Sequence, residues 1–265
     1  MSHPYIIWTM RRTGGTSLAT LLQRYAPFPR VDHEPFNSGR AWNPMVKQFG
    51  TDPTATEPAL RKALEARPVI KNCYDLHPTG LHALLMRLSS ELGYRHVILD
   101  RRNEADRLLS LVLAAQTGSW GRKSARAIYA EILDGSRKLD PIPEARLLKQ
   151  MRNAAKRRAW LAKTMAAAGL TPHTVHFEEI YAPQVDGEAR IREIFRFLDI
   201  PMEPAEKFEA DLHAAVHERA QGTADVLPLV PNIAELRALL VTQLGDAGAH
   251  GGTAPDRHAP QDSTG

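Results

Sequence analysis

The chain has 265 residues, of which 43% are hydrophobic and 24% are charged, an ordinary balance for a globular protein. This length suits one large domain rather than two, and the composition excludes a chain that is disordered throughout. The formal net charge of +4 is mildly basic, which fits a small polyanionic ligand, a nucleic acid or a membrane surface without choosing among them.

The single cysteine, Cys73, excludes an internal disulfide bond and argues against a zinc or iron–sulfur site built from cysteines. The short apolar run from Tyr5 to Met10 precedes Arg11 and Arg12, which is not the order of a signal peptide. No stretch approaches the roughly 18 apolar residues of a membrane span. We therefore expect a soluble, cytoplasmic protein without a transmembrane segment, and peripheral membrane contact stays open.

The first elements predicted along the chain are a strand, a loop and a helix. Residues 5–10 are apolar and rich in β-forming side chains, which predicts a buried strand. Residues 11–16 form a glycine-containing loop, and helical spacing of leucines follows from Ser17 to Tyr25. From Arg30 to Thr56, Pro, Asn and Gly are frequent without a clear period, so we expect a long surface excursion.

Strands and helices alternate along the rest of the chain. Further strands are expected at 68–73, 95–99 and 174–177. Helices are expected at 59–66, 79–92, from Asn103 onward, and at 125–133, 144–168, 188–198, 205–219 and 233–244. This order predicts an α/β, P-loop-like three-layer fold with a mostly parallel central sheet flanked by helices. We expect one domain over 1–244 and a disordered tail over 245–265, which has little to bury.

The loop after the first strand is a candidate anion site. Gly14 and Gly15 allow a ligand to approach the backbone, and the first amides of the following helix are unpaired donors. Further donors are expected from the side chains of Arg12, Thr13, Thr16 and Ser17. An ordinary tight turn is the alternative. The loop lacks the Lys that follows the glycines in a kinase P-loop.

A second candidate phosphate contact lies where the 95–99 strand ends. Arg101 and Arg102 follow Asp100 at the expected carboxyl end of the sheet, and Ser110 lies eight residues after Arg102, two turns into the next helix. An Arg at the strand end and a hydroxyl on the helix can grip one phosphate from two sides. The alternative is a surface Arg and a helix-face Ser that never meet.

These segments together resemble the PAPS-dependent sulfotransferases, over roughly residues 4 to 202. Residues 12–18 resemble the 5′-phosphosulfate loop, and Arg102 with Ser110 resembles the 3′-phosphate motif. Residues 101–103, with Gln116 to Trp120, look most like the bacterial carbohydrate branch, which includes trehalose and nodulation-factor sulfotransferases. Residues 176–180 and 194–201 resemble later family segments. The glycine-rich C-terminal nucleotide loop of the cytosolic members is not recognisable.

The resemblance implies transfer of a sulfonate group from PAPS to a hydroxyl of a small acceptor, a carbohydrate or glycoconjugate by analogy, leaving PAP. Arg12 and the loop amides would stabilise the leaving phosphate during in-line attack, and no metal is expected. Glu34 is the favoured general base, with His33 as the alternative. A third interpretation is that Glu34 and Pro35 only shape a turn.

Acceptor-binding residues are expected after the first helix and at the strand ends. Lys71 is unusual in a buried strand unless it points into a polar site, the alternative being an edge-strand Lys that reaches water. Trp120 either stacks on a sugar or packs in the core. The full set of acceptor candidates is Glu34, Phe36, Lys71, Tyr74, His77 and Trp120, with Asp75 beside them.

Two other functions stay open, a P-loop-type nucleotide kinase and a non-catalytic nucleotide-binding protein related to the sulfotransferases. A nucleic-acid partner is not expected, because only the charge favours one and no motif supports it. The basic residues of helix 144–168 either lie on a solvated helix face or attract an anionic acceptor, membrane or partner. The sequence does not decide whether the chain self-associates.

Overall fold

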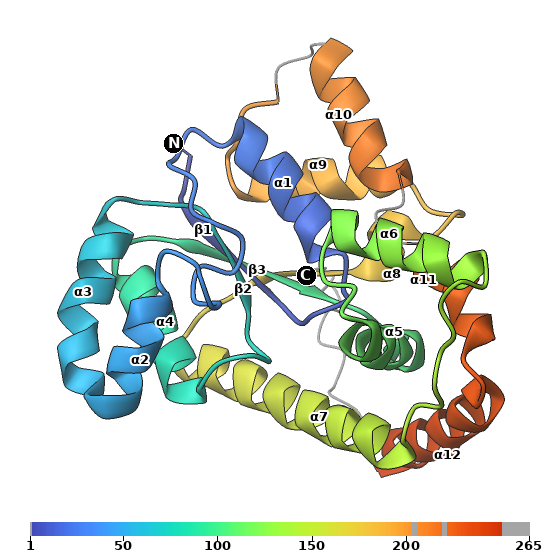
Figure 1. The fold of residues 1–265 in the computed structure, drawn as a ribbon. Helices are drawn as coiled ribbons and strands as arrows, with labels where there is room; N and C mark the ends of the chain where they lie inside the picture. Colours follow the sequence, from blue (N-terminus) through green and yellow to red (C-terminus); the bar gives the residue numbers. More distant parts are fainter. Residues whose placement is uncertain (1, 203–205, 219–221, 251–265) are drawn as a thin grey trace, which may run out of the picture.

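A computed structural model of the chain describes residues 2–202, 206–218 and 222–250. Its centre is a four-stranded sheet in the order β2-β1-β3-β4, in which every pairing is parallel (Figure 1). The strands are β1 (Tyr5–Thr9), β2 (Ile70–Cys73), β3 (Arg95–Asp100) and β4 (His173–His176). The predicted α/β class with a mostly parallel sheet is therefore confirmed.

The register of the sheet brings the loops that follow the strands to one edge. Thr9 of β1 pairs with Cys73 of β2 and with Leu99 of β3, and Asp100 of β3 pairs with His176 of β4. Because parallel strands share one direction, their carboxyl ends meet at the same edge. The predicted anion loop after β1 thus lies between the segments that follow β2 and β3.

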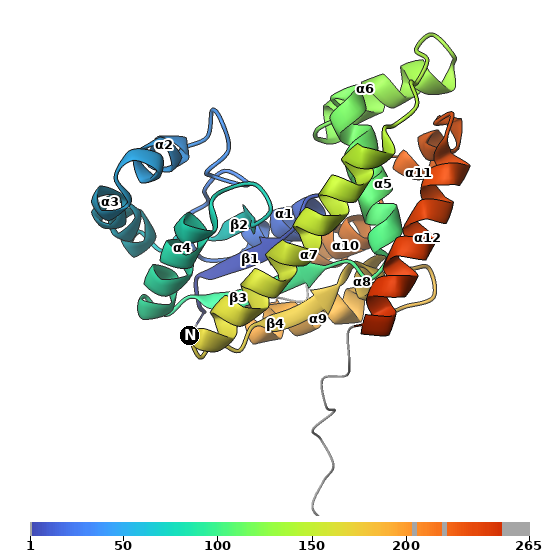
Figure 2. The same ribbon diagram turned by 90° about the horizontal axis from the view of Figure 1, so that it is seen from below.

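Helices cover the sheet on two sides and extend past one end of it (Figures 1 and 2). They are α1 (Gly15–Tyr25), α2 (Asn43–Thr51), α3 (Pro53–Glu65), α4 (Thr79–Glu91), α5 (Glu104–Thr117), α6 (Arg122–Leu133), α7 (Glu144–Ala167), α8 (Phe177–Tyr181), α9 (Gly187–Phe197), α10 (Glu206–His217), α11 (Thr223–Val226) and α12 (Ile233–His250), with a 3-10 turn over Leu227–Leu229. In the part of the chain that the structure describes, no helix is both long enough and apolar enough to cross a bilayer.

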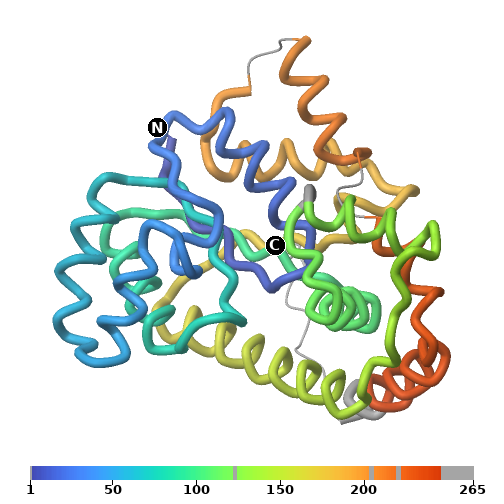
Figure 3. Tube along the Cα trace, viewed as in Figure 1, coloured from blue at the N-terminus to red at the C-terminus, as the bar shows by residue number. Residues whose placement is uncertain are grey.

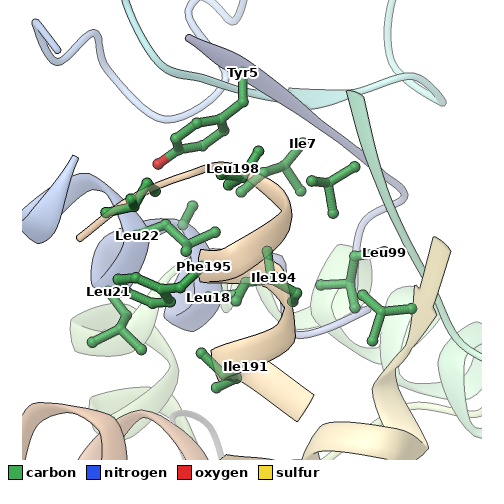
Figure 4. Close-up of a cluster of buried hydrophobic side chains, with 14 of the residues drawn as sticks. Tyr5, Ile7, Leu18, Leu21, Leu22, Leu99, Ile191, Ile194, Phe195 and Leu198 are labelled. Atoms are coloured by element: carbon green, nitrogen blue, oxygen red, sulfur yellow. The ribbon is translucent and has the colours of Figure 1, made fainter. Parts of the chain in front are cut away.

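The alternation of side chains along β1 builds two cores. Tyr5 and Ile7 face α1, α9 and α10, where Leu18, Leu22 and Phe195 pack against them (Figure 4). The neighbouring residues of β1 point to the opposite face, into a second core shared with α3, α4 and α7. Three layers result. A third apolar cluster joins α5, α6 and α12, and Figure 3 shows the path of the backbone through these elements.

Several predicted element ends shift. The segment predicted as a surface excursion contains α2 and the start of α3. α3 begins earlier than predicted because Asp52 caps it by accepting hydrogen bonds from the amides of Thr54 and Ala55. α12 continues to His250, past the end predicted at Leu244. Residues 251–265 of the predicted tail lie outside the described residues, and the single-domain boundary stays a prediction.

Candidate functional site

The loop between β1 and α1 has a backbone that only certain residues tolerate. Gly14 has a φ of 79°, and a Cβ there would lie 2.7 Å from Cε2 of Tyr181. Arg12 also has a positive φ, of 70°, and the Thr13 hydroxyl donates to the Met10 carbonyl at 2.8 Å. Both the space and the backbone angle therefore require glycine at position 14.

Helix α1 begins beside this loop with no side chain capping it. Its N-cap residue is Gly14, so the first amides point out without a side-chain acceptor, and no acidic residue lies in the first turn. The N-terminal end of a helix carries a partial positive charge that favours anions. A Cβ on Gly15 would come within 3.1 Å of Cε of Lys71, which shows how closely β2 approaches this turn.

Arg12 connects the loop to α5. Its Nε donates to Oγ of Ser110 at 2.7 Å, and its Nη2 donates to Oγ1 of Thr223 at 2.8 Å. Burial lowers the pKa of Arg12, and the nearby charge of Arg101 lowers it further, although an arginine stays protonated. These two hydrogen bonds end on hydroxyl groups rather than on carboxylates.

Arg102, the predicted partner of Ser110, lies elsewhere in the structure. Its side chain is 55% exposed and forms an ion pair with Glu179 of α8, and its amide donates to Glu178 at 3.0 Å. The reason is topological, because α8 directly follows β4, the strand beside β3. The structure therefore brings Ser110 to Arg12 and not to Arg102.

Arg101 is a second cation at the loop. Its Nη1 donates to the Arg12 carbonyl at 3.4 Å, and its guanidinium lies 4.4 Å from the ring centroid of Phe177. Its nearest acids are Asp106 at 3.8 Å and Glu178 at 4.0 Å, and burial lowers the pKa of its guanidinium. Arg101 therefore adds positive charge on the side of the loop that faces α5 and α8.

Lys71 and Glu34 form a buried pair on the other side of the loop. Lys71 is only 4% exposed although β2 lies at the edge of the sheet, so the interpretation as a lysine that reaches water is wrong. Its Nζ forms an ion pair with Oε1 of Glu34 and lies 3.4 Å from Oγ1 of Thr16 in the first turn of α1. Lys71 thus stands between the predicted donor loop and the predicted base.

Glu34 is held as a charged carboxylate. Burial alone would raise the pKa of Glu34, but the charge of Lys71 and hydrogen bonds from Lys71, Cys73 and Asn37 outweigh burial and lower it. The Cys73 thiol lies 3.1 Å from Oε1, and Asn37 Nδ2 donates to Oε2 at 2.5 Å. Cys73 and Asn37 were not predicted as partners, since nothing in their local pattern indicates this contact.

The two candidate histidines flank this pair. His33 lies 3.2 Å from the Thr20 hydroxyl through Nε2, and His77 lies 3.0 Å from Oδ1 of Asn37. In each case burial lowers the pKa of the imidazole, which favours the neutral form near neutral pH. A neutral imidazole can accept a proton, so His33 keeps the chemistry required of an alternative base.

The remaining acceptor candidates separate into buried and exposed residues. Phe36 and Tyr74 are buried in the apolar core under the site, where Phe36 packs edge-on against Trp42 and His77. Trp120 is 44% exposed, so its interpretation as a core residue is wrong, and the Arg11 guanidinium lies 5.8 Å from its ring centroid.

A small polar cavity of about 120 Å³ lies next to the loop. Arg11 and Asp75 close one side of it through a 2.8 Å ion pair. The other lining residues are Arg107, Leu111, Gln150, Asn153 and Ala154, which come from α5 and α7. Asp75 could be predicted from its place after β2. The lining residues from α5 and α7 could not be predicted, because their position beside Asp75 depends on how α7 crosses the sheet.

Comparisons with known proteins identify no family for this chain. No family model matches it, and no curated protein matches it. Among solved structures it is similar to a gluconokinase from Sinorhizobium meliloti 1021, with 18% identity over 74% of this chain and 98% of that chain, at a TM-score of 0.33. A TM-score of this size carries no argument about function.

Proposed function

We propose that this chain is a PAPS-dependent sulfotransferase that moves a sulfonate group to a hydroxyl of a small acceptor. The observation that carries the proposal is the 2.7 Å contact between Arg12 and Ser110. It joins the loop after β1 to α5, the two segments whose sequences resemble the donor motifs of that family. Their junction at the carboxyl edge of a parallel sheet is where α/β proteins bind nucleotides.

On the donor side, the hydrogen bonds of the Arg12 side chain to Ser110 and Thr223 end on hydroxyl groups. The amides at the start of α1, the Arg12 guanidinium and nearby Arg101 would meet the phosphates of PAPS. Because Arg12 donates to the neutral hydroxyls of Ser110 and Thr223, a phosphate oxygen can replace one of these partners. Arg12 is therefore the proposed stabiliser of the negative charge that grows on the leaving phosphate.

The proposed transfer is a single in-line displacement. The acceptor oxygen forms a bond to sulfur, the bond from sulfur to the bridging phosphate oxygen breaks, and its electron pair stays on the phosphate of PAP. The acceptor proton passes to Glu34. Lys71 lies between Thr16 and Glu34, so turning its ammonium toward the sulfonate would free Glu34 and restore its basicity. His33 is the alternative proton acceptor.

A carbohydrate or glycoconjugate is the proposed acceptor. Exposed Trp120 provides a flat apolar face beside Arg11, and the adjacent cavity presents Asp75, Gln150 and Asn153. Aromatic faces with carboxylate and amide groups suit the apolar and hydroxyl surfaces of a sugar. The cavity is small, so it suits one part of an acceptor rather than a long chain.

A P-loop-type nucleotide kinase is the second candidate, and one observation favours it. Nζ of Lys71 lies 3.4 Å from Oγ1 of Thr16, so an ammonium and a hydroxyl meet at the first turn of the loop helix. Kinases of this type use a Lys on the phosphates and a Ser or Thr hydroxyl on Mg²⁺. Here the Lys would come from β2 instead of from the loop itself.

Ligand-induced thermal shift on the full chain separates these candidates. A sulfotransferase should be stabilised by PAP without metal, and it should pass labelled sulfonate from PAPS to a hydroxyl acceptor. Stabilisation by ATP with Mg²⁺ but not by PAP would replace the proposal with the kinase. Binding of PAP without transfer to any member of a sugar, lipid-headgroup and phenol panel would indicate the non-catalytic alternative.

A further inference from the structure

A second cluster of chemically active side chains lies away from the loop, where α9 meets α10. Oε1 of Glu188 lies 3.0 Å from Nδ1 of His213 and 3.7 Å from Nε2 of His217. The three ligand atoms all lie within 4.8 Å of one another. The proposed sulfonate transfer uses none of these residues.

The helices explain why the three residues meet. His213 and His217 are four residues apart on α10, so they lie on one face, one turn apart. Glu188 lies in the first turn of α9, directly after Gly187. A Cβ on Gly187 would come 1.9 Å from the Ile180 carbonyl oxygen, and this tight approach sets the start of α9 close to α8 and α10.

The carboxylate of Glu188 is oriented by a neighbour. Nη1 of Arg192 lies 3.6 Å from Oε2, the oxygen that does not face the histidines, and Arg192 is itself paired with Glu209. The two imidazole rings have their centroids 4.4 Å apart. Each imidazole nitrogen and the carboxylate can offer a lone pair to a shared cation.

We propose that Glu188, His213 and His217 bind a divalent transition metal ion, with Zn²⁺ as the best fit. Neutral imidazole nitrogens and a carboxylate oxygen are ordinary Zn²⁺ ligands, and bonds of about 2.0–2.2 Å place tetrahedral ligand atoms about 3.3 Å apart. The distances of Glu188 Oε1 from the two imidazole nitrogens, 3.0 and 3.7 Å, bracket that value. Both histidines are exposed, so water completes the coordination and the ion exchanges with solvent.

The bound ion would fasten α10 to α9. α10 already packs against α1, where Tyr25 donates to Asp211 at 2.6 Å, and its last residue, His217, lies at the negative end of the helix dipole. A cation at this end is favoured electrostatically and would stabilise the outer layer on this side of the sheet. The site therefore acts on stability rather than on the transferred group.

The test measures metal binding by the full, metal-stripped chain. Isothermal titration with ZnCl₂ should give one site per chain and a rise in Tm, and Co²⁺ should give visible bands typical of tetrahedral coordination. The double variant His213→Ala/His217→Ala, which keeps the other nine of eleven histidines, should lose this site. Glu188→Gln should weaken Zn²⁺ binding by about tenfold or more.

His3→Ala is the matched control, because His3 forms a surface pair with Asp199 at 3.7 Å but has no second histidine in that pair. It should bind Zn²⁺ like the unaltered chain. Absence of Zn²⁺ binding by the unaltered chain would overturn the proposal, as would equal affinity in the double variant. Circular dichroism of each metal-free variant checks the fold, and the isosteric Glu188→Gln change tests the site even if the double variant is poorly folded.

Discussion

Arg12 and Ser110 are 98 positions apart in the sequence, yet Nε of Arg12 donates to Oγ of Ser110 at 2.7 Å. The contact crosses from the loop after β1 to the second turn of α5. It gives one guanidinium access to both predicted halves of a nucleotide phosphate site. The side chain of Arg12 donates to the hydroxyls of Ser110 and Thr223 rather than to a carboxylate, as expected of a cation that binds an anion.

Replacing Arg12 tests this role directly. Arg12→Ala should weaken PAP binding by about 10- to 100-fold, because a charge-assisted hydrogen bond contributes about 1.5–3 kcal/mol. Calorimetry with PAP measures the change. Arg24→Ala is the control, since Arg24 lies at the far end of α1 and pairs with Asp211. Unchanged affinity in Arg12→Ala would remove Arg12 from the donor site.

Arg102 should matter for one phosphate only. In the structure it pairs with Glu179, so binding the 3′-phosphate requires it to exchange a carboxylate for a phosphate. Arg102→Ala should therefore weaken PAP binding by about tenfold while leaving the weaker binding of AMP, which lacks the 3′-phosphate, nearly unchanged. Equal effects on the two nucleotides would assign Arg102 to the Glu179 ion pair alone.

Glu34→Gln should separate chemistry from binding. The amide cannot take the acceptor proton, so turnover is expected to fall by about 10²- to 10⁴-fold while the Kd for PAP changes little. Single-turnover transfer from labelled PAPS gives the rate, and thermal unfolding shows whether the loss of the Lys71 partner destabilises the chain. Loss of PAP binding with an unchanged transfer rate would exclude the base role and leave His33 as the candidate.

Protonation of Glu179 should lower the free energy of unfolding in acid. Burial would raise the pKa of Glu179, but hydrogen bonds from the His176 amide, Arg102 and Arg190 lower it to about 2. The folded pKa lies below the unfolded value of about 4.3, so this stabilisation is present above pH ~4.3 and is lost as pH falls toward 2. Urea unfolding between pH 7 and 3 should show a shallower decline in Glu179→Gln, and identical slopes would contradict the assignment.

Gly14→Ala tests the close packing of the loop. Gly14 and Gly39 have nearly the same positive φ, 79° and 75°, but only Gly14 has a neighbour in the way, Tyr181. Gly39→Ala should cost about 1 kcal/mol of unfolding free energy, and Gly14→Ala should cost more and weaken PAP binding. Equal losses of unfolding free energy in the two variants, measured by denaturant titration, would show that the Tyr181 side chain moves aside and that only the backbone angle matters.

The sequence by itself determined the scaffold of the site. The apolar run over β1, the glycines after it and the helical spacing of α1 are local patterns, so a strand, an anion loop and a helix could be predicted from near neighbours. The alternation of strands and helices then implied a parallel sheet with its loops gathered at one edge. Gly14 belongs to this group, since a positive φ in a tight turn favours glycine regardless of distant contacts.

Tertiary structure decided which side chains meet. Ser110 contacts Arg12 rather than Arg102, because acids on α8 reach Arg102 across the β3–β4 edge. Lys71 is buried beside Glu34 although it lies on an edge strand, because the segment after α1 folds over β2. Such contacts depend on how elements that are far apart in the sequence pack together, and neither residue spacing nor local propensity predicts this packing.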